Sequence, residues 1–219
     1  TEAPTADRSP VLFMCRVNET GGHLHGTGFV VSHIAKVGGV AIVVCNSHFI
    51  RDRVFVRGAV QTEPESHTTG IRAIWPGYKD KIWEGTVVAE DVKNDLCLIS
   101  IVPNHQIPVA TLGVSYPMDG TPLQSLGCPS TLNFDEGLGL STFRSSGFDS
   151  KGNACFSKLP IMGMSGSPVF SKGRVVGVIS AANHPQRPDD DKIGIAVPVN
   201  VLNEFLADAA LNLMHEHHA

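Results

Sequence analysis

Residues 159–180 read LPIMGMSGSPVFSKGRVVGVIS, in which one serine stands between two glycines just before an apolar run. The serine is Ser165, and its neighbours Gly163 and Gly166 permit backbone dihedrals that other residues avoid. They also leave room for a substrate beside the main chain. The amides of Gly163 and Ser165 can then point into one small volume. This pattern predicts an oxyanion hole formed by these two residues.

A serine in a glycine turn is ambiguous by itself, because many such turns only reverse the chain. A nucleophilic serine needs a base, and the base needs a carboxylate to orient it. His48 follows the apolar run 40–44, and Asp95 opens the alternating segment 95–102. We therefore predict a catalytic triad of His48, Asp95 and Ser165. Each residue also has a purely structural interpretation, as a core histidine, a turn aspartate and a turn serine.

Five motifs, taken in chain order, resemble those of the chymotrypsin-fold (trypsin-like) serine proteases. They are GTGFVVS at 26–32, NSH around His48, NDLCLI around Asp95, GMSGSP around Ser165 and IGIAVPVN at 193–200. The first and last motifs are most similar to the HtrA (Deg) branch, and the V8-like glutamyl endopeptidases are the second choice. The resemblance covers roughly residues 10 to 207, and it implies a serine endopeptidase.

The fold implied by this resemblance is all-β, with two six-stranded antiparallel β-barrels and a C-terminal α-helix. Short alternating runs between Gly, Pro and polar turns predict the strands. The first barrel is predicted from residues 11–17, 25–32, 39–44, 53–60, 86–91 and 95–102. The second is predicted from 122–127, 139–146, 153–159, 167–170, 175–181 and 194–198. Apolar residues at mostly helical spacing over 200–214 predict the helix, with Asn200 as its cap.

The predicted domains follow from these elements. Residues 1–103 form an N-terminal barrel carrying His48 and Asp95, and residues 104–116 connect it to a C-terminal barrel, 117–199, carrying Ser165. Residues 200–219 form the helix and tail. The length of 219 residues suits one all-β unit, and 42% hydrophobic with 17% charged residues is typical of a globular chain. The 22 glycines and 14 prolines fit many short strands joined by tight turns.

Charge and hydropathy limit the kinds of partner that we expect for the protein. The formal net charge is −4 and no Lys/Arg cluster is present, so we expect no nucleic-acid partner. No run of about 18 apolar residues exists, so we expect no membrane span. The polar start lacks a signal-peptide core, and a chain without an initial Met suggests processing or excision. The expected partner is a peptide or protein substrate. A monomer is favoured, with a homotrimer through the apolar segment 11–14 as the alternative.

Cysteines and histidines give no reason to expect a metal or cofactor. The five cysteines are an odd number without close pairs, which favours small core thiols in a reducing intracellular compartment. The histidine groups at 23–25 and 215–218 lack cysteine or carboxylate partners at ligand spacing. The three aspartates at 189–191 are interpreted as a solvated turn. A calcium contact or an attraction for basic substrate residues are the alternatives.

By resemblance, the pocket for the P1 side chain of the substrate (S1) is lined by Leu159, Ile161, Ser180, Ala181, Ala182 and Gly194. These residues are apolar or small, so aliphatic or modest aromatic P1 side chains should fit. Leu159 at the base offers no carboxylate for Lys or Arg. Glutamyl endopeptidases carry a histidine where Ile179 stands here, although His184 keeps an acidic P1 preference open.

Zymogen-activated relatives have an aspartate before the serine, where this chain has Met164. Activation by an ion pair with a new N-terminus is therefore not expected. Two further hypotheses remain beside the cellular enzyme. One is a catalytically inactive protease-fold binding module, and the other is a viral polyprotein-processing protease.

Overall fold

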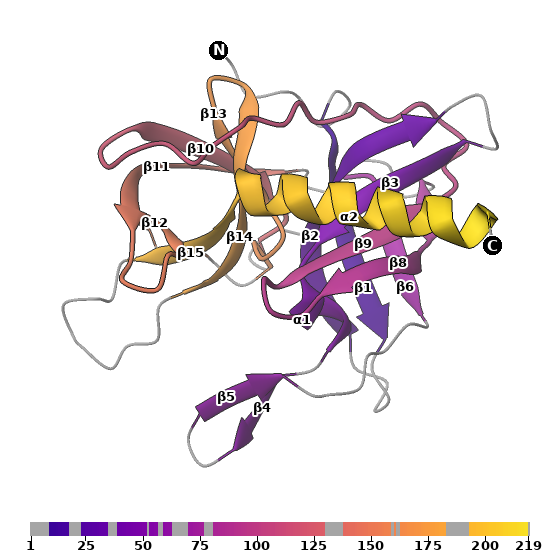
Figure 1. Ribbon diagram of the computed structural model, residues 1–219, viewed down its shortest axis with the longest axis horizontal. Helices are drawn as coiled ribbons and strands as arrows, with labels where there is room; N and C mark the ends of the chain where they lie inside the picture. The colour runs from indigo at the N-terminus through magenta and orange to yellow at the C-terminus, as the bar shows by residue number, and fades with distance from the viewer. Residues whose placement is uncertain are drawn as a thin grey trace.

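The computed structural model describes residues 9–17, 23–34, 39–51, 53–56, 59–62, 70–76, 81–129, 138–158, 160, 163–182 and 193–218. Two β-sheets form the body of the protein, and one long helix lies across them (Figure 1). The N-terminal sheet has seven strands in the order β7-β6-β1-β2-β3-β9-β8. Their bounds are β1 Val11–Val17, β2 His23–Ile34, β3 Val40–Cys45, β6 Ile71–Ile74, β7 Ile82–Glu84, β8 Thr86–Asp91 and β9 Leu96–Ile101.

The two edge strands of this sheet are consecutive in the chain. β7 ends at Glu84, β8 begins at Thr86, and only Gly85 separates them. The amide of Gly85 donates to the carbonyl of Ile71 in β6, at 3.0 Å. The sheet thus curls until the chain passes from one edge to the other at a single residue. β7 and β8 therefore act as two halves of one bent strand.

The second sheet is a closed barrel in the order β10-β11-β12-β15-β14-β13. Its strands are β10 Pro122–Gly127, β11 Gly139–Phe148, β12 Ala154–Phe156, β13 Pro168–Ser171, β14 Arg174–Ala182 and β15 Gly194–Pro198. All pairs are antiparallel. The fold is thus mostly β and chymotrypsin-like with a C-terminal helix, as predicted. The second barrel is closed and has the six strands expected, whereas the first is a curled sheet of seven strands.

A shared apolar core lies between the two sheets. It joins Phe29, Val44 and Leu98 of the first sheet to Leu126, Val178 and Val197 of the second. The C-terminal helix α2 (Val199–His218) adds Leu202 and Ala209 to the same core. Figure 1 shows α2 crossing in front of both sheets. The two halves of the molecule share this core. The division of the chain into separate domains therefore remains a prediction from the sequence.

Several element predictions need correction. The run 53–60 is not a barrel strand, because its residues belong to two paired strands, β4 (Arg53–Val56) and β5 (Ala59–Thr62), which form a separate two-stranded sheet. Its place in the first sheet is taken by β6 and β7, which were not predicted. Helix α2 begins at Val199, directly after Pro198, so Asn200 lies inside the helix rather than capping it. The one-turn helix α1 (Ser47–Ile50) was also missed.

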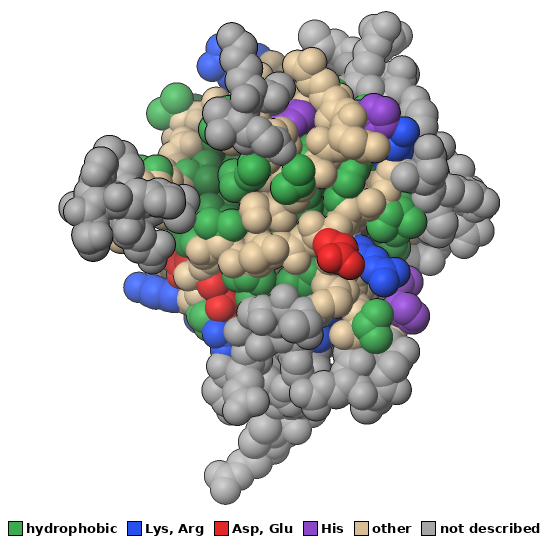
Figure 2. Space-filling model, turned by 90° about the vertical axis from the view of Figure 1, so that its right-hand side faces the viewer, with side chains coloured by type: hydrophobic (Ala, Val, Ile, Leu, Met, Phe, Trp, Pro, Cys, Tyr) green, Lys and Arg blue, Asp and Glu red, His purple; other side chains and the backbone are tan. Residues whose placement is uncertain are grey.

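Charged side chains are sparse on one described face of the molecule. On the face drawn in Figure 2, the few charged side chains are scattered among hydrophobic and uncharged polar ones. Within the part of the chain that the structure describes, no helix has both the length and the apolar character needed to span a bilayer.

We predict that Gly85→Ala lowers the free energy of unfolding by about 1–3 kcal/mol, the usual cost of overpacking a core. A Cβ at Gly85 would lie 2.6 Å from Cγ2 of Ile99 and 2.9 Å from Cγ2 of Ile71. Urea denaturation measures the change. The adjacent exposed Thr86→Ala is the control and should shift stability by no more than about 0.5 kcal/mol. Equal midpoints for both variants would contradict the tight packing at this bend.

Candidate active site

The first element of the candidate site is the single turn α1, which presents His48. It follows β3 after Asn46, whose backbone is extended (φ −86°, ψ 149°). Phe49 and Ile50 are buried in the core of the first sheet, and this anchors the turn. The side chain of His48 is only 16% exposed. The side chain of His48 therefore projects from the core at a fixed position.

Asp95 lies at the end of the tight turn Val92–Asp95 between β8 and β9. Its φ of +56° is left-handed, a conformation that aspartate tolerates better than most residues. The carboxylate of Asp91 accepts hydrogen bonds from the amide (3.1 Å) and Nδ2 (2.7 Å) of Asn94, which hold the turn closed. Asn46 Nδ2 donates to the carbonyl of Asp95 at 3.0 Å. These local bonds fix Asp95 directly beside α1.

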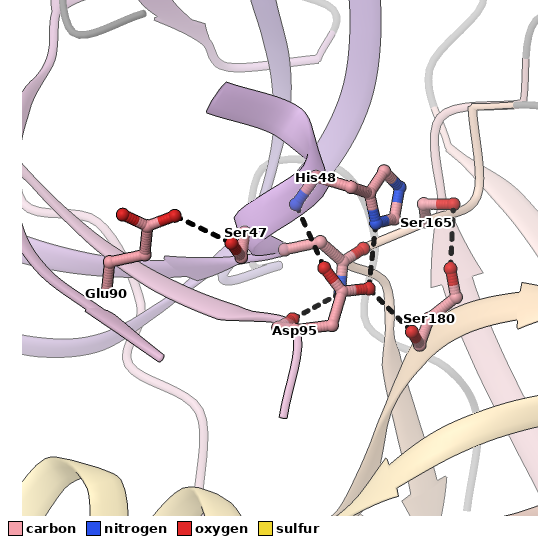
Figure 3. Close-up of polar contacts among 7 residues, drawn as sticks. Ser47, His48, Glu90, Asp95, Ser165 and Ser180 are labelled. Atoms are coloured by element: carbon pink, nitrogen blue, oxygen red, sulfur yellow. Dashed lines mark hydrogen bonds and ion pairs between the residues drawn. The ribbon is translucent and has the colours of Figure 1, made fainter. Parts of the chain in front are cut away.

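The Asp95 carboxylate accepts three hydrogen bonds, drawn in Figure 3. Oδ1 accepts from the backbone amide of His48 at 2.9 Å, and Oδ2 accepts from His48 Nδ1 at 2.7 Å. Oδ2 also accepts from the hydroxyl of Ser180 at 2.6 Å. Because Nδ1 faces a carboxylate, it carries the proton, and Nε2 is left as the basic nitrogen of the neutral ring. The imidazole thus has one orientation and one tautomer.

These contacts set the charge of Asp95. Burial alone would raise the pKa of its carboxyl, but the hydrogen bond and charge of His48 outweigh this effect, with help from the Ser180 hydroxyl and the His48 amide. The pKa of Asp95 therefore lies below its ordinary value. The carboxylate is therefore ionised at neutral pH.

Ser165 sits in the turn that the sequence motif predicted, between Gly163 (φ +93°) and Gly166 (φ +89°). A Cβ at Gly166 would lie 1.9 Å from the carbonyl oxygen of Thr27, so only glycine fits there. The amide of Thr27 in β2 donates to the Ser165 carbonyl at 2.9 Å, and Thr27 Oγ1 donates to the Gly163 carbonyl at 2.8 Å. The turn belongs to the second barrel, yet the first sheet holds it.

His48 and Ser165 meet in one small pocket of about 70 Å³, which Gly26 and Phe49 also line. Figure 3 shows the imidazole beside the Ser165 side chain. The Ser165 hydroxyl lies 3.4 Å from the carbonyl oxygen of Ser180, a long hydrogen bond. Among the hydrogen bonds of the described residues, none uses the amides of Gly163 or Ser165 as donors. Both amides are therefore available to a ligand.

Of the residues expected around S1, the structure describes some and not others. Leu159 and Ile161 lie outside the described residues, as does the 189–191 run, and the side chains of Ala181 and Ala182 are not described. The hydroxyl of Ser180 donates to Asp95, and its carbonyl accepts the long bond from Ser165. A Cβ at Gly194 would lie 2.1 Å from the Phe156 ring, which therefore covers this glycine closely.

Sequence reasoning missed the residues that support the site. Thr27 and Asn46 hold the Ser165 and Asp95 backbones, and Glu90 accepts a hydrogen bond from Ser47 at 2.7 Å. Thr27 stands inside the GTGFVVS motif, and Asn46 and Ser47 stand inside the NSH motif, so these motifs were the available signals. No local pattern marks Glu90. In the described part of the chain, no three His, Cys, Asp or Glu side chains cluster so as to hold a metal ion.

Comparison with known proteins identifies the family. A family profile for the trypsin-like peptidase domain matches residues 26–178, which is well over half of the chain and includes His48, Asp95 and Ser165. The chain belongs to the trypsin-like peptidase family. No curated protein sequence matches this trypsin-like peptidase.

Solved structures of similar fold come from two bacteria. The Rv3671c protease of M. tuberculosis in its active form has a TM-score of 0.66 and 22% identity, covering 92% of this chain and 81% of that one. Its serine-to-alanine mutant in the inactive form has a TM-score of 0.64 and 21% identity, covering 94% and 89%. The serine endoprotease from Yersinia pestis has a TM-score of 0.68 and 17% identity, covering 95% and 68%. At these identities the likeness shows the fold alone.

The lowered pKa of Asp95 predicts a pH dependence of stability. In the unfolded chain an aspartate titrates near pH 3.9, and in the folded peptidase Asp95 titrates lower. The stabilisation of the folded state by Asp95 is thus fully present above about pH 3.9 and is lost as the pH falls through the folded-state pKa. Asp95→Asn should make the fall in unfolding free energy between pH 5 and pH 2.5 shallower, as measured by urea denaturation. The exposed Asp119→Asn is the control, and identical slopes for both variants would contradict the prediction.

Proposed function

We propose that this trypsin-like peptidase is an active serine endopeptidase that uses Ser165 as nucleophile, His48 as general base and Asp95 as the orienting carboxylate. One observation carries the proposal. The Asp95 carboxylate binds both the amide and Nδ1 of His48, and the imidazole lies beside Ser165 in the same pocket. A core histidine or a turn aspartate would need neither this double contact nor a neighbouring serine.

The chemistry follows from the hydrogen bonds. With Nδ1–H held by Asp95, Nε2 accepts the Ser165 hydroxyl proton as Oγ attacks the carbonyl carbon of the substrate. The same proton then passes from Nε2 to the leaving amine as the C–N bond breaks. Water, deprotonated by Nε2, hydrolyses the acyl-enzyme and restores the serine. Asp95 stabilises each transient imidazolium cation, because its carboxylate stays ionised beside the ring.

The nucleophile needs only a small motion. Its hydroxyl contacts the Ser180 carbonyl at 3.4 Å, and rotation about the Cα–Cβ bond can exchange this long contact for one to the imidazole. Catalytic hydrogen bonds are often loose without substrate and tighten in the complex. The oxyanion of the tetrahedral intermediate would accept from the amides of Gly163 and Ser165. Neither amide donates a hydrogen bond among the described residues, which supports this role.

We expect wild-type protein to react with a fluorophosphonate probe and Ser165→Ala not to react. His48→Ala and Asp95→Asn should each lower the labelling rate by about 10³- to 10⁴-fold, because the hydroxyl loses its base or the base loses its tautomer. Gel fluorescence measures the labelling. If wild type does not label while circular dichroism shows a folded protein, the inactive binding module becomes the better account.

We propose that the substrate side chain at P1 is apolar. The assignment of this protein to the HtrA branch remains a prediction from the sequence motifs. The Phe156 ring over Gly194 supports an apolar P1, since it offers carbon rather than charge to this part of the barrel. Strand β14 is paired with β13 only as far as Val178, so its end at 180–182 offers a backbone edge near Ser165 for an extended substrate.

Cleavage of a peptide library by this protein should therefore favour small or medium aliphatic residues at P1 over Glu, Lys and Arg by at least about tenfold, because charged side chains would be desolvated without a partner. Mass spectrometry of the products gives the profile, with the Ser165→Ala protein as background. A preference for Glu or Arg would overturn the apolar pocket.

A further inference from the structure

The turn that presents His48 is too short to hold its own orientation. α1 has four residues, Ser47–Ile50, and a helix of one turn is unfavourable by itself. Its N-cap residue, Asn46, makes no side-chain capping bond: Nδ2 donates to the carbonyl of Asp95, and the buried Oδ1, the atom that would cap the turn, accepts no hydrogen bond from the described residues. The direction of the imidazole must therefore be fixed by bonds from neighbouring elements.

Glu90, in β8, supplies such bonds at both ends of the turn. Its Oε1 accepts from the hydroxyl of Ser47 at 2.7 Å and from Nε of Arg51. Its Oε2 accepts from a terminal nitrogen of the same guanidinium at 2.9 Å. Ser47 directly precedes His48, and Arg51 follows the last residue of α1. One carboxylate thus holds the turn before and after the histidine.

The environment makes these bonds strong. Ser47 is 1% exposed, and the side chains of Arg51 and Glu90 are 15% and 16% exposed. Burial alone would raise the pKa of the Glu90 carboxyl, but the hydrogen bonds from Arg51 and Ser47 and the charge of Arg51 bring it below its ordinary value. A two-point contact between a guanidinium and a carboxylate is also directional. Loss of Glu90 would leave Arg51 and Ser47 without these bonds in a poorly hydrated position.

The same hairpin supplies both carboxylates that hold α1. Glu90 lies near the end of β8, and Asp95 closes the turn that leads from β8 to β9. Figure 3 shows Glu90 and Asp95 reaching α1 from different sides, through Ser47 and through His48. Asp95 contacts the imidazole itself, whereas Glu90 contacts only the residues beside it.

We propose that Glu90 is a positioning residue for His48, acting through Ser47 and Arg51. The proposal rests on the proposed function, in which His48 is the general base. It assigns to Glu90 the task of keeping Nε2 aimed at Ser165, since a small misplacement of a catalytic group costs rate out of proportion to its effect on folding. Arg51 serves as the counter-charge that keeps Glu90 ionised.

The first test does not depend on activity. In the Ser165→Ala protein, NMR with ¹⁵N-labelled histidine follows the low-field proton on Nδ1 of His48 and its exchange with water. Adding Glu90→Gln should broaden this resonance or speed its exchange at least about threefold, because a looser turn opens the bond to Asp95 more often. The matched control is Asp149→Asn, which removes a carboxylate that accepts three hydrogen bonds in the turn between β11 and β12. It should leave the resonance unchanged.

The second test is kinetic. Glu90→Gln should lower kcat and the fluorophosphonate labelling rate together, by about 10- to 100-fold, with KM within about twofold. Glu90→Asp should recover part of the rate. Ser47→Ala combined with Glu90→Gln should be no slower than Glu90→Gln alone, because both changes weaken the same contact between residues 47 and 90. Asp149→Asn should keep the wild-type rate.

The outcomes separate the two proposals. If wild type does not label, the proposed function fails, and the NMR comparison alone decides the role of Glu90. If Glu90→Gln lowers the melting temperature but leaves the Nδ1 proton unchanged, Glu90 has only a structural role and the inference is overturned. Additive effects of Ser47→Ala and Glu90→Gln would overturn the route through Ser47.

Discussion

The Asp95 carboxylate is the contact on which the arrangement of the site depends. Two of its three hydrogen bonds go to His48, in the same half of the molecule, and the third comes from Ser180 in β14 of the second barrel. A single ionised group thus orients the imidazole and also joins the two sheets. Its low pKa follows from the same bonds. The electrostatics of the site and the cohesion of the two halves therefore have one origin.

The serine turn is fixed in a reciprocal way. Ser165 belongs to the second barrel, but the backbone and hydroxyl of Thr27 in β2 hold the carbonyls of Ser165 and Gly163. Each half of the molecule therefore holds a residue of the proposed triad that belongs to the other half. The apolar core between the sheets, with α2 packed over it, supplies the burial that keeps these few polar bonds aligned.

Much of this architecture could be predicted from local sequence, and the failures have physical causes. The motifs around His48, Asp95 and Ser165 are short and local, and the strands near them have clear alternation. β6 and β7 have four and three residues, too few for a period to be recognised, so the longer run 53–60 was assigned to the sheet instead. Its Gly58 was the available sign of a break. The proposed role of Glu90 depends on which residue of β8 lies beside α1. This long-range contact cannot be predicted from the local sequence of β8 or of α1.

The bend at Gly85 has a consequence for how the chain can be rearranged. The edge strands of the first sheet are β7 and β8, and the single residue Gly85 connects them in the chain. A circular permutant with its new termini at this residue would keep every strand pair but would cut the covalent link between the two edge strands. The edge strands could then move apart and offer their unpaired amides and carbonyls to other molecules. Gly85 thus keeps the two edges of the sheet together, as well as fitting between its isoleucine neighbours.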